Sequence, residues 1–249
     1  MKKLGLLGYP LGHSFSKKYY LDKFLNENIK DIDYDLYPIP SIEELTSLYT
    51  EDERFYGFNV TIPYKQEVIK LLNDISEEAK EIGAVNCITI KRKAGIPFLK
   101  GYNTDAYGFE VSLKPLLKKQ HKQALILGNG GAAKAVSYTL KKLGIPFKII
   151  SRSKQNGDLT YADLNKEVIT NHQVIINCSP VGTFPNVDES PTIPYEGIGE
   201  QHLLYDLIYN PEETAFLKEG RKRNAVIKNG YEMLVKQADK NWDIWNETV

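Results

Sequence analysis

The sequence predicts an α/β protein with two domains, on three observations. Short apolar, β-branched runs alternate along the chain with amphipathic segments of helical spacing, which is the pattern of an α/β fold. The 249 residues exceed the usual size of one compact domain, and 42% of them are hydrophobic, enough for two cores. A glycine-rich turn beginning at Gly128 follows a buried strand and precedes a helix, as in a Rossmann-type nucleotide-binding domain.

The first hundred residues contain five apolar segments with strand character. They predict strands at residues 3–7, 34–39, 58–61, 84–90 and 98–102. Ser16 is suited to cap a helix after the first strand. Ser41 and Glu44 have the spacing of a capping box that opens another helix. Pro63 suits the first position of a helix carrying Lys65 to Leu72.

The second series of elements begins after residues 103–105. A helix is expected to about residue 117, followed by strands at 124–127, 147–150, 174–177, 203–207 and 225–227. Helices are expected between them at 132–143, 162–170 and 212–222. A last helix follows Gly230, with Leu234, Ala238, Trp242 and Trp245 forming one apolar stripe. We interpret the two tryptophans as packing anchors.

The balance of charge argues against some classes of partner. Thirty-two basic residues match thirty-two acidic ones, so no global field favours nucleic acid or an anionic membrane. The densest basic stretch, Lys218 to Arg223, is most simply a solvated helix end. Cys87 and Cys178 have no partner at metal or redox spacing, so we expect buried free thiols and no metal. With no long apolar run and no signal peptide, we expect a cytoplasmic protein, monomeric or homodimeric.

The glycine-rich turn predicts a dinucleotide site. Residues 123–131 read QALILGNGG, and Gly128, Gly130 and Ala133 match the pattern G-x-G-x-x-A. The first glycine permits a tight turn, the second lets the backbone approach a pyrophosphate, and the alanine lets helix and strand pack closely. The helix N-terminus adds unpaired N–H groups for the phosphates.

The next strand of this domain indicates which dinucleotide is bound. For NAD, an acidic residue about twenty positions further on would meet the ribose hydroxyl. Here the strand ending at Ile150 leads instead into Ser151, Arg152 and Ser153. A guanidinium pairs well with phosphate oxygens, so the sequence predicts NADP.

Several segments have an unusual density of polar groups beside apolar strands. They are NVTIPYK at residues 59–65, GAVNCI at 83–88 and GYNTDAYGF at 101–109, together with HSFS at 13–16, Tyr209 and NGYEMLVKQA at 229–238. Taken in chain order, these segments span nearly the whole sequence, and with them the sequence resembles the shikimate dehydrogenase family. That resemblance implies NADP-dependent interconversion of 3-dehydroshikimate and shikimate in aromatic amino-acid biosynthesis.

The resemblance also implies roles for individual residues. Ser14 and Ser16 would hold the substrate carboxylate with Tyr209. The ring hydroxyls would be held by Thr61, Lys65, Asn86, Asp105 and Gln237. Lys65 and Asp105 would be the catalytic pair. The cofactor would be held by Gly128, Asn129, Gly130, Gly131, Ala132, Ser151, Arg152 and Ser153, with Glu77, Leu207 and Gly230 near it. The substrate domain would comprise residues 1–104 and 230–249, and the NADP domain residues 105–229.

These residue types suit the implied chemistry. Hydroxyl, amide, carboxylate and ammonium groups supply the donors and acceptors that a polyhydroxylated ring needs. Hydride transfer belongs to the cofactor, so the protein must position it and manage one proton. The sequence leaves open which of Lys65 and Asp105 handles that proton. Two alternatives also stay open, an NAD-using quinate/shikimate dehydrogenase and a catalytically silent NADP-binding regulator.

Overall fold

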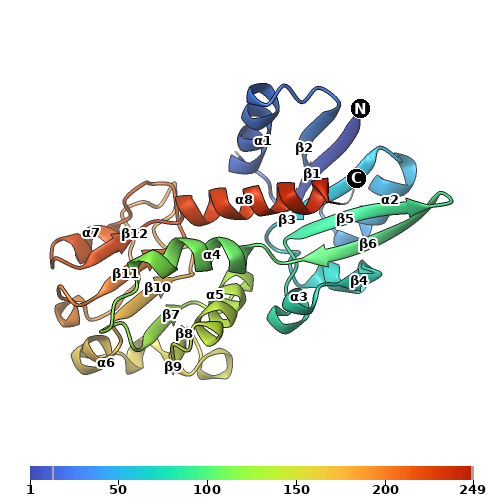
Figure 1. Cartoon of the computed structure of the whole chain (residues 1–249). Helices are drawn as coiled ribbons and strands as arrows, with labels where there is room; N and C mark the ends of the chain where they lie inside the picture. Colours follow the sequence, from blue (N-terminus) through green and yellow to red (C-terminus); the bar gives the residue numbers. More distant parts are fainter. Residues whose placement is uncertain (13, 248–249) are drawn as a thin grey trace. The chain divides into compact units, whose positions relative to one another are not determined.

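The computed structural model describes residues 1–12 and 14–247, and the chain divides into two compact units (Figure 1). The first unit comprises Met1–Thr104 and Gln237–Val249, and the second comprises Asp105–Lys236. Each unit has one sheet with helices packed against it. The predicted α/β class is therefore confirmed.

The first unit has a mixed sheet, six-stranded among the described residues, in the order β2-β1-β3-β5-β6-β4. Strand β1 pairs in parallel with β2 on one side and β3 on the other. Strand β5 is antiparallel to both β3 and β6. The strands are β1 Lys2–Gly8, β2 Ile32–Pro38, β3 Phe55–Val60, β4 Asp74–Ile75, β5 Cys87–Lys93 and β6 Ile96–Tyr102.

Local capping explains where the helices of this unit begin. Helix α1 (Phe15–Asn26) has Ser14 at its N-cap, so Ser16 lies inside the helix and the prediction that it caps the helix was wrong. The capping box at Ser41 is confirmed; it opens a 3-10 turn (Ile42–Glu44) that continues into α2 (Leu45–Glu51).

One helix of this unit, α3 (Glu77–Ile82), was not predicted from the sequence. The Ser76 hydroxyl accepts from the Ala79 N–H at 3.2 Å at its start. Gly83 ends it in the left-handed region at φ 69°, a common helix terminator. Both signals are present in the sequence.

The segment after β3 also differs from its predicted structure. Residues 62–66 form a turn and Glu67–Leu71 a 3-10 helix, where an α-helix from Pro63 was predicted. The Lys65 carbonyl accepts from the Val85 N–H at 2.7 Å, a partner outside any helix. Strand β5 begins at Cys87, so Asn86 lies in the bend before the strand and not within it.

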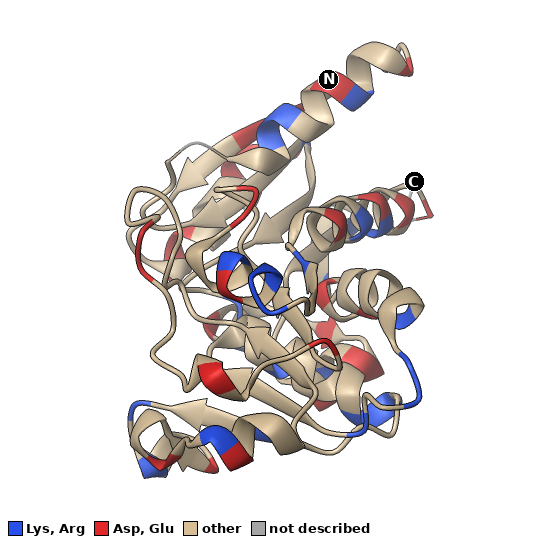
Figure 2. Cartoon of the chain, turned by 90° about the vertical axis from the view of Figure 1, so that its left-hand side faces the viewer, with Lys and Arg blue, Asp and Glu red and all other residues tan. Residues whose placement is uncertain are grey.

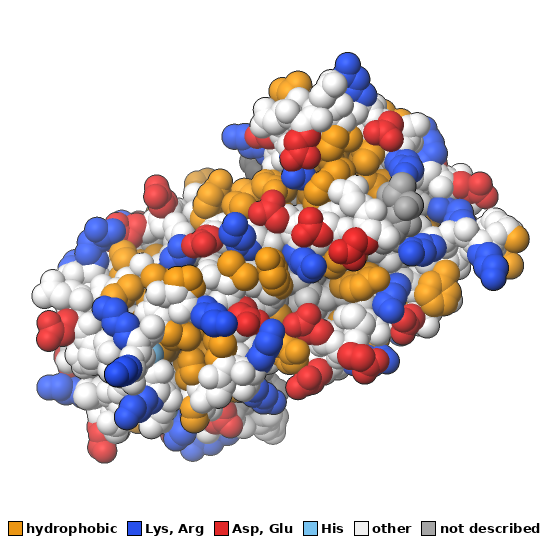
Figure 3. Space-filling view, in the orientation of Figure 1, with side chains coloured by type: hydrophobic (Ala, Val, Ile, Leu, Met, Phe, Trp, Pro, Cys, Tyr) orange, Lys and Arg blue, Asp and Glu red, His pale blue; other side chains and the backbone are white. Residues whose placement is uncertain are grey.

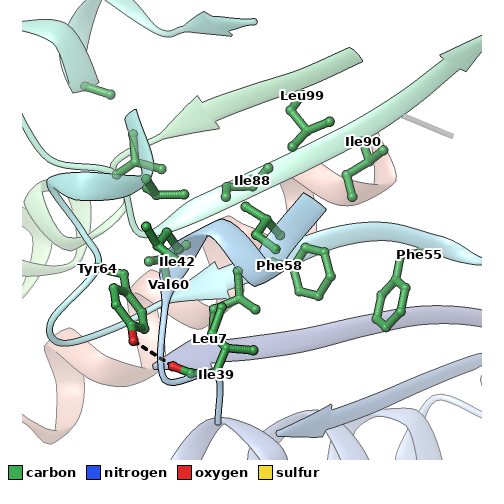
Figure 4. Close-up of a cluster of buried hydrophobic side chains, with 14 residues drawn as sticks. Leu7, Ile39, Ile42, Phe55, Phe58, Val60, Tyr64, Ile88, Ile90 and Leu99 are labelled. Atoms are coloured by element: carbon green, nitrogen blue, oxygen red, sulfur yellow. Dashed lines mark hydrogen bonds between the residues drawn. The ribbon is translucent and has the colours of Figure 1, made fainter. Parts of the chain in front are cut away.

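Two clusters of buried side chains form the core of the first unit. One gathers Phe55, Phe58 and Ile88 with neighbours from the strands and turns (Figure 4). The Tyr64 hydroxyl is satisfied there by the Ile39 carbonyl at 2.6 Å. The other cluster packs α1 and the end of α8 (Tyr231–Asn246) against the sheet.

Trp245 anchors the last helix to the sheet of the first unit. Its side chain is fully buried, and Nε1 donates to the Ile88 carbonyl at 3.0 Å. The indole lies against Gly57, where any Cβ atom would overlap Nε1. The interpretation of Trp245 as a packing anchor is confirmed; Trp242 is partly buried and packs against Phe24.

The second unit has a wholly parallel sheet, six-stranded among the described residues, in the order β12-β11-β10-β7-β8-β9. Along β7, Ala124 and Ile126 belong to one buried cluster and Leu125 and Leu127 to another. Because side chains alternate between the faces of a strand, both faces are covered. The strands are β7 Ala124–Leu127, β8 Phe147–Ser151, β9 Leu159–Thr160, β10 Val174–Asn177, β11 Leu203–Asp206 and β12 Val226–Lys228.

The helices of the second unit divide between the two faces. Helices α4 (Asp105–Leu113) and α5 (Gly131–Lys142) contribute to the first cluster, and α6 (Lys166–Asn171) and α7 (Ala215–Arg221) to the second. This is a doubly wound, Rossmann-type arrangement. Helix α6 is shorter than predicted because a separate 3-10 turn, Tyr161–Asp163, precedes it.

Charges of both signs are interspersed over the chain (Figures 2 and 3). In the basic stretch near the end of α7, Arg221 pairs with Glu213, while Lys222 and Arg223 pair with Glu219. These local ion pairs support the interpretation of the stretch as a solvated helix end. Within residues 1–12 and 14–247, no helix is long and apolar enough to cross a bilayer.

Candidate functional site

The predicted substrate residues of the first unit lie near the ends of β1, β3 and β5. Thr61 follows β3, and its N–H donates to the Leu7 carbonyl at 2.9 Å. Lys65 lies in the next turn, half-buried, with its backbone tied to Val85. Asn86 precedes β5, and its carbonyl accepts from the Val60 N–H at 2.9 Å. Backbone hydrogen bonds thus bring the NVTIPYK and GAVNCI segments together.

A buried polar network runs through this part of the unit. Asn86 is 2% exposed, and its amide nitrogen donates to the Thr104 hydroxyl at 2.9 Å. The Thr104 N–H donates back to Asn86 Oδ1 at 2.7 Å. The Thr104 hydroxyl also donates to Asn241 Oδ1 at 2.6 Å, and Asn241 Nδ2 donates to Gln237 Oε1 at 3.0 Å. Buried polar groups require such partners, so the network fixes the orientation of Asn86 and Gln237.

The same network extends towards the N-terminal helix. Asn59 donates from its amide to the Asn86 carbonyl at 3.3 Å and accepts from the Tyr34 hydroxyl at 2.9 Å. Burial raises the pKa of Tyr34, and the nearby Ser16 side chain opposes this shift, so the Tyr34 hydroxyl stays protonated as a donor. Tyr34, Asn86 and Gln237 are therefore joined through hydrogen-bonded buried groups, and Ser16 lies beside Tyr34.

Ser14 and the segment around it complete the first group. Ser14 is partly buried at the N-cap of α1, and its side chain makes no capping hydrogen bond within the described part of the chain. A serine at this position that leaves the helix N–H groups uncapped is available for another acceptor or donor. His13, in the same motif, lies outside the described residues.

The glycine-rich turn of the second unit has the geometry that the motif predicts. Gly128 joins β7 to the turn at φ 105°, and its N–H donates to the Ile150 carbonyl at 2.8 Å. Gly130 is the N-cap of α5, and a Cβ atom there would meet nothing within 4 Å. The amides of Gly131, Ala132 and Ala133 open this 12-residue helix and have no acceptor four residues back within it. The turn therefore fits a pyrophosphate approaching the backbone.

The loop after β8 lies beside this turn. Asn129 Nδ2 donates to the Asn156 carbonyl at 2.8 Å, which links the two loops. The buried Ser151 hydroxyl donates to the Ser153 carbonyl, and the Ser153 N–H donates to the Ser151 hydroxyl oxygen at 3.2 Å. Arg152 is exposed between them, and none of the ion pairs within residues 1–12 and 14–247 includes it. The nearest acids of the loop, Asp158 and Asp163, bind the backbone at Ile149 and Thr160.

Leu207 and Gly230 lie together in the second unit. The Gly230 N–H donates to the Ile208 carbonyl at 3.0 Å, and a Cβ at Gly230 would overlap the Leu207 carbonyl. Asp206, fully buried just before them, accepts from Asn177, Ile208 and Thr214. Burial raises the pKa of this carboxyl from 3.8 to about 6. The hydrogen bonds to the buried Asp206 therefore hold the end of β11 and the residues that follow it, Leu207 and Tyr209, in place.

The remaining predicted residues are not gathered within one unit. Asp105 is 6% exposed and begins α4 in the second unit, whereas Lys65 belongs to the first. Tyr209 is exposed in the second unit, and burial of part of its ring raises its pKa. Glu77, in the first unit, is a surface residue paired with Lys80 at 2.6 Å. The catalytic pairing of Lys65 with Asp105 stays a prediction.

Among the described residues, no three or more His, Cys, Asp or Glu side chains lie together as possible metal ligands. Both cysteines are free; Cys87 is buried and Cys178 is partly buried. Burial raises the thiol pKa of both, which keeps them protonated.

Comparison with known proteins gives a match across the chain. The model of the shikimate dehydrogenase substrate binding domain matches residues 6–88. The NADP(+) shikimate dehydrogenase of Clostridium beijerinckii is 39% identical, over 99% of this chain and 93% of that protein. The chain belongs to the shikimate dehydrogenase family.

Solved structures of similar fold extend this result. The shikimate 5-dehydrogenase of Thermus thermophilus, in complex with NADP(H) and shikimate, is 29% identical with a TM-score of 0.85, covering 99% of this chain and 94% of that one. The quinate dehydrogenase of Corynebacterium glutamicum, in complex with NAD, has a TM-score of 0.87 at 23% identity, with the same coverage. That second likeness concerns the fold alone.

Four members of the polar network were not predicted individually from the sequence. Tyr34 has the pattern of an ordinary aromatic strand residue. Asn59 and Thr104 stand out only as parts of their segments. Asn241 had a usable signal, because it is a polar residue one turn after Gln237 within the apolar stripe of α8.

Proposed function

We propose that this protein is an NADP-dependent shikimate dehydrogenase that reversibly reduces 3-dehydroshikimate to shikimate in chorismate and aromatic amino-acid biosynthesis. The observation that carries the proposal is the buried network that joins Tyr34, Asn86 and Gln237 in the first unit, with Ser16 beside Tyr34. A site of neutral amides and hydroxyls suits a ring bearing several hydroxyls. Relatives that share nearly the full length carry the same activity in their names.

We assign most of the substrate contacts to residues of the first unit and most of the NADP contacts to residues of the second. Ser14, Ser16 and Tyr209 hold the carboxylate, and the ring hydroxyls are held by Thr61, Lys65, Asn86, Asp105 and Gln237. The turn at Gly128, Asn129, Gly130, Gly131 and Ala132 receives the pyrophosphate, and Ser151, Arg152 and Ser153 receive the 2′-phosphate. Glu77, Leu207 and Gly230 complete the surroundings of the cofactor.

NADP supplies the hydride chemistry when it is bound. The protein's own residues manage the proton at the substrate oxygen. In the reducing direction, an ammonium at Lys65 Nζ donates to the oxygen on which negative charge develops. Asp105 is the other member of the pair and orients the same hydroxyl. We expect a cytoplasmic enzyme that acts as a monomer or homodimer.

A substitution at Lys65 tests this assignment. Lys65→Ala should lower kcat about 10²- to 10⁴-fold, the usual contribution of one acid–base group, while the KM for NADP changes little. Lys70→Ala is the matched control, because Lys70 lies in the following 3-10 helix with 57% of its side chain exposed and pairs only with Glu43 in the described structure. Unaltered turnover of Lys65→Ala would contradict the mechanism.

A further inference from the structure

Asn177 is a fully buried polar residue at the end of β10, and no role in the reaction is assigned to it. Its backbone carbonyl accepts from the Leu207 N–H at 3.0 Å, which continues the pairing of β10 with β11. Strand β10 lies between β7 and β11 in the sheet, so its end lies beside the glycine-rich turn and beside the segment that carries Leu207. A primary amide buried there requires hydrogen-bond partners.

One backbone donor fixes the orientation of the Asn177 side chain. The Ser179 N–H can only donate, and it lies 3.1 Å from Asn177 Oδ1. The Ser179 hydroxyl donates to the same oxygen at 2.6 Å, so both lone pairs of Oδ1 are used. Nδ2 is the other end of the amide, and it donates to Asp206 Oδ1 at 3.0 Å and to the Val181 carbonyl at 3.4 Å.

Asp206 connects this amide to further segments of the second unit. Its fully buried carboxyl also accepts from the Ile208 N–H at 3.1 Å and from the Thr214 hydroxyl at 2.6 Å. Thr214 is the N-cap of α7. The hydrogen bond between Asn177 and Asp206 therefore joins the loop that follows β10 to the loop that follows β11.

The loop that Asn177 holds, residues 178–182, packs against the glycine-rich turn. The Cys178 N–H donates to the Leu127 carbonyl at 2.9 Å. A Cβ atom on Gly128 would lie 3.2 Å from the Ser179 nitrogen and 3.3 Å from the Cys178 carbonyl carbon, so the two backbones are in close contact. A displacement of this loop would therefore change the surface beside the turn that we assign to the pyrophosphate.

The order of the strands indicates which half of a dinucleotide meets this loop. Strand β8 lies on one side of β7 and β10 on the other, so the strand order reverses at β7. A dinucleotide lies across the crevice at such a point, outside the carboxyl ends of the strands. Arg152 follows β8 and is assigned to the 2′-phosphate of the adenosine half. The β10 side, with residues 178–182, is left for the nicotinamide half.

We propose that Asn177 is a positioning residue for the cofactor. By joining Ser179 to Asp206, it holds residues 178–182 against the glycine-rich turn, and this loop supports the nicotinamide half of the bound dinucleotide. This inference rests on the proposed function, in which the second unit contributes most of the NADP contacts. It requires that Asn177 acts on one half of the cofactor and leaves the binding of the other half unchanged.

The test compares two ligands in titration calorimetry with the whole protein. They are NADP and adenosine 2′,5′-bisphosphate, which is the adenosine half alone. Asn177→Asp keeps the acceptor for Ser179 but places a second carboxyl oxygen 3.0 Å from Asp206, and two carboxylates this close repel each other at pH 8. We expect NADP binding to weaken about tenfold, the scale of one hydrogen bond, with the binding of adenosine 2′,5′-bisphosphate unchanged.

The pH dependence of the same variant gives a readout that a merely structural role would not move. At pH 5 the two carboxyls can share one proton, which takes the place of the amide N–H. The affinity of Asn177→Asp for NADP, relative to the wild type at the same pH, should therefore recover. Cys178 and Tyr195 sense the charge of Asp206, and burial raises the pKa of both, so they stay neutral from pH 5 to pH 8.

Two further variants guard the interpretation. Asn171→Asp makes the same change in an exposed residue that precedes the opposite end of β10, and it should leave both affinities unchanged. Ser179→Ala removes the hydroxyl donor to Asn177 without adding a charge. It should weaken NADP binding several-fold, again with no change for the adenosine half. Thermal unfolding of each variant without ligand shows whether the fold is retained.

The outcomes distinguish this inference from the function on which it rests. If both ligands weaken by the same factor in Asn177→Asp and Ser179→Ala, or neither weakens, the positioning role is refuted, and the proposed function stands as long as the wild type oxidises shikimate. If the wild type binds NADP but does not oxidise shikimate, the proposed function fails, and the two affinities still decide the role of Asn177. If the wild type binds neither ligand, the proposed function and this inference fall together.

Discussion

Asp206 offers the clearest prediction about stability. Its carboxyl is fully buried at the end of β11, where Oδ1 accepts from Asn177 at 3.0 Å and from the Ile208 N–H at 3.1 Å. Oδ2 accepts from the Thr214 hydroxyl at 2.6 Å. Asp206→Asn keeps Oδ1 and its two donors. Its new Nδ2 faces the Thr214 oxygen, which already accepts from Leu217 and has a second lone pair.

The size of the expected pH-dependent change in the free energy of unfolding follows from the shift in the pKa of Asp206. Burial raises the pKa of Asp206 from 3.8 to about 6, and each pKa unit corresponds to about 1.4 kcal/mol. The folded state therefore holds its proton more tightly than the unfolded chain. The associated stabilisation is complete below about pH 4 and is lost as pH rises through 6. The full loss is about 3 kcal/mol, with Cys178 and Tyr195 the neighbouring groups that sense the charge.

The assay is urea unfolding of the wild-type protein and Asp206→Asn at several values between pH 4 and pH 8. Carboxyls whose pKa is lowered by ion pairs, such as Asp52 and Asp74, titrate equally in both proteins and cancel in the difference. The Asn variant should gain stability relative to the wild type as pH rises, by about 3 kcal/mol in total. A difference in unfolding free energy that stays constant over this range would refute the reasoning.

Three further predictions concern the cofactor turn and the core. Arg152→Ala should lower the preference for NADP over NAD about 10- to 100-fold, because one charge-assisted hydrogen bond is lost. Arg221 is an exposed arginine of the same unit, so Arg221→Ala should leave the preference as it is. An unchanged preference in Arg152→Ala would refute the 2′-phosphate assignment. Gly130→Ala should preserve the unfolding midpoint, because its Cβ meets nothing within 4 Å, but it should weaken NADP binding at least tenfold in calorimetry. Gly128 has a φ of 105°, so Gly128→Ala should instead lower the free energy of unfolding by about 1–3 kcal/mol. Trp245→Phe should lower the free energy of unfolding in urea by about 1–3 kcal/mol, because the hydrogen bond to Ile88 is lost and space opens at Gly57. A loss no larger than that of Trp242→Phe would contradict the role of Trp245 as an anchor.

Periodicity identified most strands of both sheets but not the short or irregular elements. Strands β7 and β10 follow from continuous apolar runs, since both faces of a parallel sheet are buried. The two-residue strands β4 and β9 are too short to show any period. The segment around Lys65 resembles a helix start, but its backbone is tied to Val85, a partner twenty residues away. Propensity cannot report such a contact.

The site was predictable as a set of residues and only partly as a structure. Ser16, Asn86 and Gln237 were selected through the family motifs. Hydrogen bonds through Thr104 and Asn241 connect Asn86 with Gln237, and hydrogen bonds through Asn59 connect Asn86 with Tyr34, which lies beside Ser16. Those connections depend on the register of β3, β5 and α8, which no local pattern encodes. The glycine turn was predictable in detail because its geometry is local, and Gly128 and Gly130 have the backbone roles that their spacing implies.

The most direct test of the central claim is the rate of cofactor reduction by the wild-type protein with shikimate or quinate and with NADP or NAD. We predict rapid formation of NADPH from shikimate and NADP. NAD should be much the poorer cofactor, because Arg152 directly follows β8 where NAD binding would require a carboxylate. A preference for quinate with NAD would contradict the assignment of substrate and cofactor. Tight binding of NADP without oxidation of shikimate or quinate would contradict catalysis itself and indicate a silent regulator.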